Sequence, residues 1–147
     1  MDRKQFIKTA GMACICGTAV VSILQSCASS NYFAKFSVAH KKIILPQSEF
    51  IKIEKDNKQT IRKFVIVKSE LTSFPICVFK ISDSKYSALL MECTHRSCEL
   101  NPQGSFLMCP CHGSEFSNKG IVQNPPAENN LISYNVTVEN ENLIIHL

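Results

Sequence analysis

Tryptophan is absent from this 147-residue chain, and glycine is scarce, with only five residues. Three of these glycines lie beyond residue 26, all between Gly104 and Gly120. Charge of either sign is also weak, because 16 Lys and Arg residues face 12 Asp and Glu residues, a scattered net charge of +4. So small and dispersed a charge argues against a nucleic-acid partner. The clustered glycines indicate that one short stretch needs unusual backbone conformations.

Cysteine, by contrast, is abundant. Eight Cys together with four His make metal binding or disulfide formation the first question to ask of the chain. The composition, with 45% apolar and 19% charged residues, is that of a folded protein and not of a disordered one. The length is enough for one domain with a tail.

The N-terminus has the pattern of an export signal. Three basic residues within the first eight precede an uncharged run at 9–24, which leads into the sequence Leu-Gln-Ser-Cys at 24–27. As a helix this run would span roughly 24 Å, less than the ~30 Å of a hydrocarbon core. We therefore predict a signal peptide over residues 1–26.

Two motifs refine this prediction. Leu-x-Ser-Cys resembles the lipobox of bacterial lipoproteins, which implies that Cys27 carries a lipid. The pair Arg3-Lys4 resembles the twin-arginine export motif, with Lys in place of its second Arg. An uncleaved membrane helix and simple secretion are the alternatives. We expect an exported, membrane-anchored protein that faces the periplasm or the cell exterior, with a small, polar tether at 27–34 and the folded domain at 35–147.

The folded part has the pattern of a series of short strands. Apolar, β-branched or alternating stretches predict strands at 61–67, 76–81, 86–91, 131–138 and 143–147, with further candidates at 36–45 and 49–53. Short polar separators at 82–84 and 139–141 predict hairpins. No stretch after the signal shows an amphipathic helical period. We expect an all-β fold, either a small antiparallel barrel or a sandwich.

Residues 92–130 do not show this pattern of short strands and are expected to form a long functional loop region. They contain the sequences CTHRSC at 93–98 and CPCHGS at 109–114. Thiolate and imidazole ligands together could serve zinc, but zinc fingers keep their Cys pair and their His pair apart, whereas each sequence here mixes the two. Two facing Cys/His loops suit two irons with unequal ligands better.

These two sequences resemble the cluster-binding motifs of the Rieske iron–sulfur family, and the resemblance extends over roughly residues 75–140. It implies a [2Fe–2S] cluster with Cys93 and Cys109 on one iron and His95 and His112 on the other. It also implies the Rieske fold, in which a small antiparallel barrel carries a cluster-binding subdomain built from two loops.

The same resemblance assigns further residues. In the respiratory-type branch of the family, Cys98 and Cys111 would form a disulfide across the loops, and a disulfide needs the oxidising compartment that export supplies. Ser114 corresponds to the Ser whose hydroxyl donates to a bridging sulfide. Phe116 stands where high-potential members have Tyr, and Arg96 stands where quinol-oxidising members have an apolar residue.

The remaining candidates have simpler interpretations. Cys77 lies in an apolar run and is expected to pack as a small hydrophobic residue. His40 and His146 have no partner motif and are expected to be structural or surface residues. The sequence Asn-Pro-Pro-Ala at 124–127 resembles the proline-containing loop that covers the cluster in the family.

The family resemblance implies one-electron transfer. No residue outside the cluster motifs resembles a catalytic acid, base or nucleophile, so any substrate chemistry would belong to a redox partner, a cytochrome or an oxidoreductase subunit. We predict the iron–sulfur subunit of a membrane electron-transport complex of the cytochrome bc kind. The alternatives are a free-standing, lipid-anchored Rieske electron carrier and the small subunit of an exported oxidoreductase, such as an arsenite-oxidase-like enzyme.

Overall fold

The structure, a computed structural model, describes residues 31–147. Within this range the only helix is the four-residue 3-10 turn η3 (Gln47–Phe50), and every other element is a strand. No helix in this part of the chain is long and apolar enough to cross a membrane. The predicted signal peptide at 1–26 and the predicted lipidation site Cys27 lie outside the described residues.

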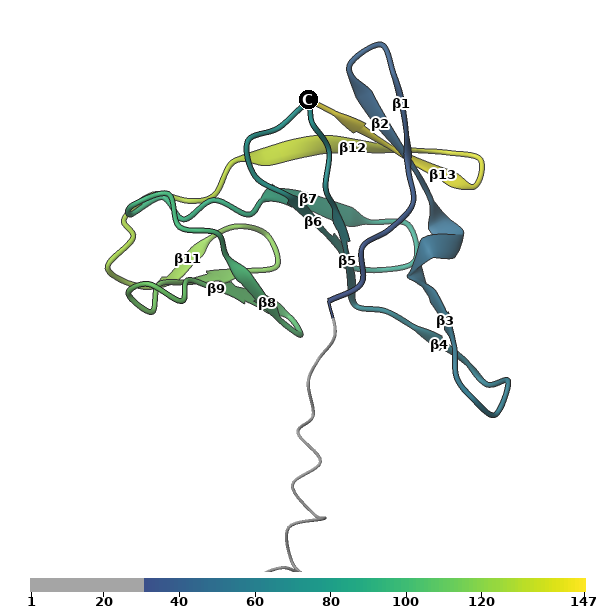
Figure 1. Ribbon diagram of the computed structural model, residues 1–147, viewed down its shortest axis with the longest axis horizontal. Coiled ribbons are helices and arrows are strands. Elements are labelled where there is room, and N and C mark those ends of the chain that lie inside the picture. Colours follow the sequence, from purple (N-terminus) through teal and green to yellow (C-terminus); the bar gives the residue numbers. More distant parts are fainter. Residues whose placement is uncertain (1–30) are drawn as a thin grey trace, which may run out of the picture. The chain divides into compact units, whose positions relative to one another are not determined.

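The largest sheet has seven strands, and each pair of neighbours in it runs antiparallel (Figure 1). Its order is β1 (Ser37–Ala39), β2 (Lys42–Pro46), β13 (Asn142–His146), β12 (Ser133–Glu139), β7 (Tyr86–Leu90), β6 (Ile76–Lys80) and β5 (Phe64–Val67). The predicted hairpins at 82–84 and 139–141 connect β6 to β7 and β12 to β13. The all-β prediction is therefore confirmed.

Two smaller sheets flank the large one on opposite sides (Figure 1). One has the order β11 (Val122–Asn124), β10 (Glu115–Ser117), β9 (Phe106–Met108) and β8 (Asn101–Gln103). The other is the hairpin of β3 (Ile51–Ile53) and β4 (Gln59–Ile61). Residues 92–130 are thus not loop alone, as the sequence suggested, because they contain the whole four-stranded sheet. Its strands have three residues each, too few to show an alternating pattern.

Two predicted strands are each divided by a turn. The stretch 36–45 becomes the β1–β2 hairpin, whose turn residues His40 and Lys41 both have positive φ, 49° and 61°. The stretch 61–67 breaks after Ile61, and its two halves join different sheets. The end of the predicted tether is also ordered, since Tyr32–Ala34 form a parallel bridge with β5.

Strands β5, β6 and β7 are buried on both faces and so divide the interior into two cores. In β6, Ile76 and Val78 face the core beneath β2 and β13, while Cys77 and Phe79 face the four-stranded sheet. Such two-sided burial produces a nearly continuous apolar run in place of alternation. The second core also contains Cys93 and Cys109, so the cluster motifs lie at its edge.

Candidate metal centre

Two loops with the same backbone hydrogen bonds present the Cys and His residues. In the loop 93–98, the N–H of Cys93 donates to the carbonyl of Cys98 (2.9 Å), and the N–H of Ser97 donates to the carbonyl of Cys93 (2.8 Å). The loop 109–114 repeats both bonds. The N–H of Cys109 donates to the carbonyl of Ser114 (2.8 Å), and the N–H of Gly113 donates to the carbonyl of Cys109 (3.0 Å). Each loop is therefore closed on itself and presents its side chains from a fixed backbone.

Both loops place their fifth residue in the left-handed region. That residue is Ser97 in the first loop, with φ 51°, and Gly113 in the second, with φ 78°. Glycine adopts this conformation freely, whereas an L residue such as Ser does so at a cost. The first loop thus holds a strained residue where the second uses Gly.

Replacing Ser97 with Gly should stabilise the domain by roughly 0.5–1 kcal/mol, because relief of left-handed strain outweighs the added freedom of Gly in the unfolded chain. The midpoint of thermal unfolding, followed by circular dichroism, should rise by a few degrees. Ser105→Gly is the matched control, since Ser105 is exposed and its φ is not positive. That variant should be slightly destabilised. A Ser97→Gly protein that melts at or below the parent temperature would contradict the strain argument.

The two loops bring four side chains together as two pairs, the thiols of Cys93 and Cys109 and the rings of His95 and His112. The thiols of Cys93 and Cys109 are 1% exposed. The rings of His95 and His112 lie edge to face, with centroids 4.9 Å apart and an interplanar angle of 84°. Among the described residues, Nδ1 of His95 is buried and has no hydrogen-bond partner. A pair of buried thiols and a pair of adjacent imidazoles, one with an unpartnered nitrogen, are a donor set of the kind that metal ions occupy.

The environment of the Cys93 thiol suits binding of a metal cation. Burial raises the pKa of the Cys93 thiol, backbone hydrogen bonds from His95 and Arg96 lower it, and the neighbouring thiol of Cys109 raises it again. A thiolate in so apolar a position needs positive charge beside it. The backbone donors add further stabilisation of negative charge on this sulfur.

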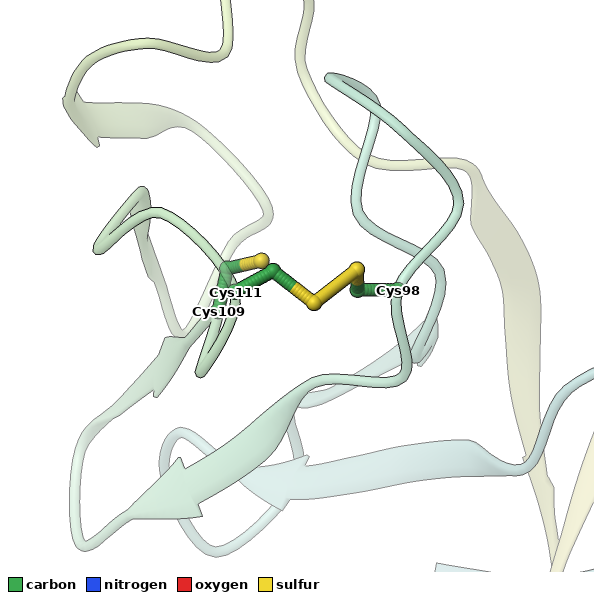
Figure 2. Close-up of side chains that lie close together, drawn as sticks. All are labelled: Cys98, Cys109 and Cys111. Carbon is green, nitrogen blue, oxygen red and sulfur yellow. A yellow bond between two sulfur atoms is a disulfide. The ribbon is translucent and has the colours of Figure 1, made fainter.

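The predicted disulfide is present: Cys98 and Cys111 are bonded across the two loops, with their Cα atoms 6.6 Å apart (Figure 2). Together with Cys109 they form a group of three sulfurs within 4.8 Å of one another. This group is not itself a metal site, because disulfide sulfurs offer no thiolate. The disulfide instead packs directly against a buried thiol of the donor set.

A third segment, 124–130, is tied to both loops. The hydroxyl of Thr94 donates to the carbonyl of Asn129 at 2.6 Å, which links the segment to the first loop. The side-chain amide of Asn124 donates to the carbonyl of Gly113 at 3.1 Å, which links it to the second. These bonds join residues up to 35 positions apart. The family resemblance implied that 124–127 lies near the cluster, but the sequence offered no signal for the individual bonds.

Ser114 makes a third link to this segment. Its side chain is fully buried, and its Oγ accepts a hydrogen bond from the backbone N–H of Ala127 at 2.9 Å. Because the N–H occupies an acceptor position, the hydroxyl proton of Ser114 stays available for donation. Phe116, two residues on, is fully buried in the second core with Cys93 and Cys109.

The other sequence candidates lie away from this centre. Cys77 is fully buried in β6, and burial raises its pKa well above the ordinary value, so it packs as an inert apolar residue. His146 Nε2 lies 3.0 Å from the Thr137 hydroxyl on the neighbouring strand, which is a structural contact. Arg96 is exposed at the tip of the first loop.

An antiparallel β fold that presents two Cys and two His from a pair of disulfide-linked loops defines a class of iron–sulfur proteins. The family model for the Rieske [2Fe-2S] domain matches residues 41–135, more than half of the chain. The protein therefore belongs to the Rieske family, and its cofactor is a [2Fe–2S] cluster of the Rieske type.

Relatives and a solved structure agree with this assignment. The cytochrome b6-f complex iron-sulfur subunit of Synechococcus sp. (strain CC9605) is 42% identical over 55 residues, and the match covers 36% of this chain and 31% of the relative. The subunit of the same name from Prochlorococcus marinus (strain MIT 9303) is 38% identical over 55 residues. The chain thus spans about a third of the curated relatives that it matches.

Among solved structures, the plasma membrane Rieske protein PetC3 from Synechocystis PCC 6803 superposes with a TM-score of 0.52 and 27% sequence identity. The superposition covers 58% of this chain and 87% of that protein. The Rieske fold expected from the two motifs is confirmed.

Proposed function

We propose that Cys93 and Cys109 hold one iron of the cluster and that His95 and His112 hold the other. The observation that carries this assignment is a pair of buried thiols and a pair of adjacent imidazoles, presented by two loops with the same backbone hydrogen bonds. When bound, the cluster supplies one-electron exchange with a redox partner. Zinc bound in its place, with no acid-labile sulfide in the purified protein, would refute the assignment.

The surrounding residues have separate tasks. The second core shields the two sulfurs from water, and the disulfide and the segment 124–130 keep the loops together. Ser114 accepts from the N–H of Ala127, so its hydroxyl proton would be free to donate to a bridging sulfide of the cluster. A donor at this position stabilises negative charge on sulfur and so favours the reduced form.

At the level of the whole protein, we propose that the chain is the iron–sulfur subunit of a membrane electron-transport complex. The named function of the curated relatives supports this proposal, although the match covers 31% of the first of them. The interloop disulfide also supports it, because it implies a compartment outside the reducing cytoplasm.

Affinity purification from detergent-solubilised membranes tests this proposal. We expect a cytochrome with b-type haem to co-purify and to exchange electrons with the chain. Purification without haem would favour the free-standing carrier, and a molybdenum-containing partner would favour the small subunit of an exported oxidoreductase.

The proposed anchor is a lipid on Cys27, added after removal of residues 1–26. Cys27→Ser should move the protein from the membrane fraction to the soluble fraction, or leave it as unprocessed precursor, because the acyl chains on Cys27 would supply the membrane affinity, about 0.8 kcal/mol per buried CH2. Immunoblotting of fractions measures both outcomes, with Cys77→Ala as a control for loss of a cysteine elsewhere. Unchanged size and membrane retention in Cys27→Ser would point to an uncleaved helix instead.

Phe116→Tyr should raise the reduction potential of the cluster. The hydroxyl would enter the core that contains Cys93 and Cys109 and add a donor that favours the reduced form. If the bond differs by about 1.4 kcal/mol between redox states, the potential rises by ~59 mV. We expect the parent value below the top of the Rieske range of about −150 to +300 mV.

A redox titration followed by electron paramagnetic resonance measures the change. Phe106→Tyr is the control, because Phe106 is only half-buried and lies outside that core. Equal potentials for Phe116→Tyr and the parent, with both clusters intact, would show that no donor reaches the sulfurs from this position.

A further inference from the structure

The β3–β4 hairpin exposes three isoleucines on one face. Ile51 pairs directly with Ile61, and Ile53 pairs with Gln59, so these side chains lie on the same side of the two-stranded sheet. Ile51, Ile53 and Ile61 are 44%, 68% and 65% exposed. Ile51 and Ile61 also line an adjoining cavity of about 510 Å³. Contiguous exposed apolar side chains on an otherwise polar hairpin mark an interaction surface.

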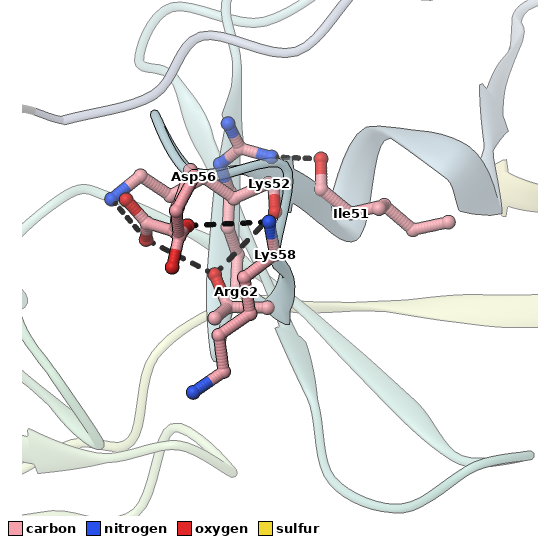
Figure 3. Close-up of polar contacts among 7 residues, drawn as sticks. Ile51, Lys52, Asp56, Lys58 and Arg62 are labelled. Carbon is pink, nitrogen blue, oxygen red and sulfur yellow. Dashed lines mark hydrogen bonds and ion pairs between the residues drawn. The ribbon is translucent and has the colours of Figure 1, made fainter.

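The other face and the tip of this hairpin are polar. Lys52 lies on the opposite face, paired with Glu54 at 2.7 Å, and the tip carries Asp56 and Lys58 (Figure 3). Residues 51–63 contain five Lys or Arg and two acidic residues, a net charge of +3. Basic charge around an apolar face is complementary to an anionic lipid surface.

The start of the folded domain lies against the base of this hairpin. Arg62 follows β4, and its guanidinium stacks 3.8 Å from the centroid of the Tyr32 ring. The Tyr32 hydroxyl donates to Glu49 at 2.9 Å, and Arg62 donates to the carbonyl of Glu49. Arg62 also donates to the carbonyl of Ile51 (Figure 3). Residues 32 and 62 are therefore fixed relative to each other.

This contact limits the distance between the hairpin and the proposed anchor. Five peptide links separate Cys27 from Tyr32, and they span at most about 18 Å when fully extended. A lipid on Cys27 would thus keep the base of the hairpin close to the bilayer. The sheet β8–β11 lies on the other side of the seven-stranded sheet and would remain free for a protein partner (Figure 1).

We propose that the isoleucine face of the β3–β4 hairpin docks on the surface of an anionic membrane and orients the domain. This inference rests on the N-terminal anchor of the proposed function. Ile51, Ile53 and Ile61 enter the interfacial region, and the exposed Lys55 and Lys58 at the tip of the hairpin contact lipid phosphates. A two-stranded hairpin is only marginally stable by itself, so contact with lipid also stabilises it.

The absence of tryptophan from the chain allows a direct test. Ile53→Trp and Ile61→Trp each place one indole on the isoleucine face, and Ile121→Trp is the control, because Ile121 is 51% exposed beside the four-stranded sheet. Each full chain is purified from membranes and reconstituted into phosphatidylglycerol vesicles with brominated or unbrominated acyl chains. Flotation shows whether the chain is anchored, and the visible spectrum shows whether the cluster domain is intact.

We expect brominated lipid to quench the emission of Ile53→Trp and Ile61→Trp and to leave that of Ile121→Trp unchanged. High salt, or vesicles of phosphatidylcholine, should restore emission, because both weaken the attraction of the basic residues. If the chains float with the vesicles but the emission of both Ile53→Trp and Ile61→Trp stays unquenched, the contact between hairpin and lipid is refuted and the anchor is not. Quenching that does not change with salt concentration or lipid charge would refute the proposal that the membrane surface must be anionic. Chains that do not float would overturn the anchor and the hairpin contact together.

Emission that is blue-shifted in native membranes, yet unquenched in brominated vesicles of the purified chain, would also refute the proposal. It would mean that a protein partner and not lipid covers the isoleucine face. The two reporter positions protect the test from a local folding defect, since Ile53 and Ile61 lie on different strands of the hairpin.

Discussion

Replacing either His95 or His112 with Ala should leave the protein without its native cluster. Each imidazole would supply half of the nitrogen ligands of one iron, and the nearest alternative sulfurs, Cys98 and Cys111, are consumed in the disulfide. We expect iron and acid-labile sulfide to fall from two of each per chain to near zero. The low average g value that is typical of mixed Cys/His ligation should disappear from the electron paramagnetic resonance spectrum.

The two His→Ala variants should lose the cluster for slightly different reasons. His95 is partly buried, and its Nδ1 has no partner within the described part of the chain, so the ring is poised for a ligand that the protein does not supply. His112 is exposed, so its loss creates little cavity and should barely affect the apoprotein fold. Loss of the cluster in His112→Ala therefore reports on ligation more directly than loss in His95→Ala.

His146→Ala is the matched control. His146 contacts Thr137 in the seven-stranded sheet and lies outside both cluster loops. Its removal should cost at most about 1–2 kcal/mol of stability and leave iron, sulfide and spectrum unchanged. Full iron content with an unaltered spectrum in His112→Ala would refute the assignment of this ligand.

The sequence was informative where chemistry is local. The two motifs keep their Cys and His within six residues, so the ligand candidates and, through the family resemblance, the disulfide pair could be named without knowledge of the fold. Strands of four or more residues, such as β6 and β13, were also predictable, because their apolar runs end in clear turn residues.

Elsewhere the structure depends on contacts that the sequence does not display. The turn at His40-Lys41 has positive φ at both residues, a conformation for which Asn-Gly is the usual signal. The four-stranded sheet is assembled from three-residue strands, one of which contains Pro102. The links from Thr94 to Asn129 and from Asn124 to Gly113 depend on the tertiary fold alone.

The isoleucine face shows a similar limit. Ile51, Ile53 and Ile61 look like core residues in the sequence, and the alternation of Ile51 and Ile53 predicts a half-buried strand. Only the three-dimensional arrangement shows that no other element in residues 31–147 covers this face. The strand predicted at 49–53 is present only over Ile51–Ile53, because residues 49 and 50 belong to the 3-10 turn η3. That its isoleucine face is uncovered could be learned only from the structure.

Removing both Cys98 and Cys111, as the Cys98→Ala/Cys111→Ala variant, should loosen the cluster loops without removing a ligand. The disulfide closes a separation of 13 residues, and a bridge of this size typically contributes ~2–4 kcal/mol. The double change avoids a lone thiol at the exposed position 111. We expect a lower melting temperature and faster release of iron to a chelator, measured by the decay of visible absorbance.

The loops should loosen and not separate, because the third segment still joins them. Thr94 remains bonded to Asn129, and Ser114 remains bonded to Ala127, so the variant should still assemble a cluster with the parent spectrum. Cys77→Ala is the control, because Cys77 is a free cysteine outside the cluster loops, and this variant should release iron at the rate of the parent. Equal release rates for the oxidised parent and the double variant would show that the hydrogen bonds of the third segment suffice. The disulfide would then have no part in retaining the cluster.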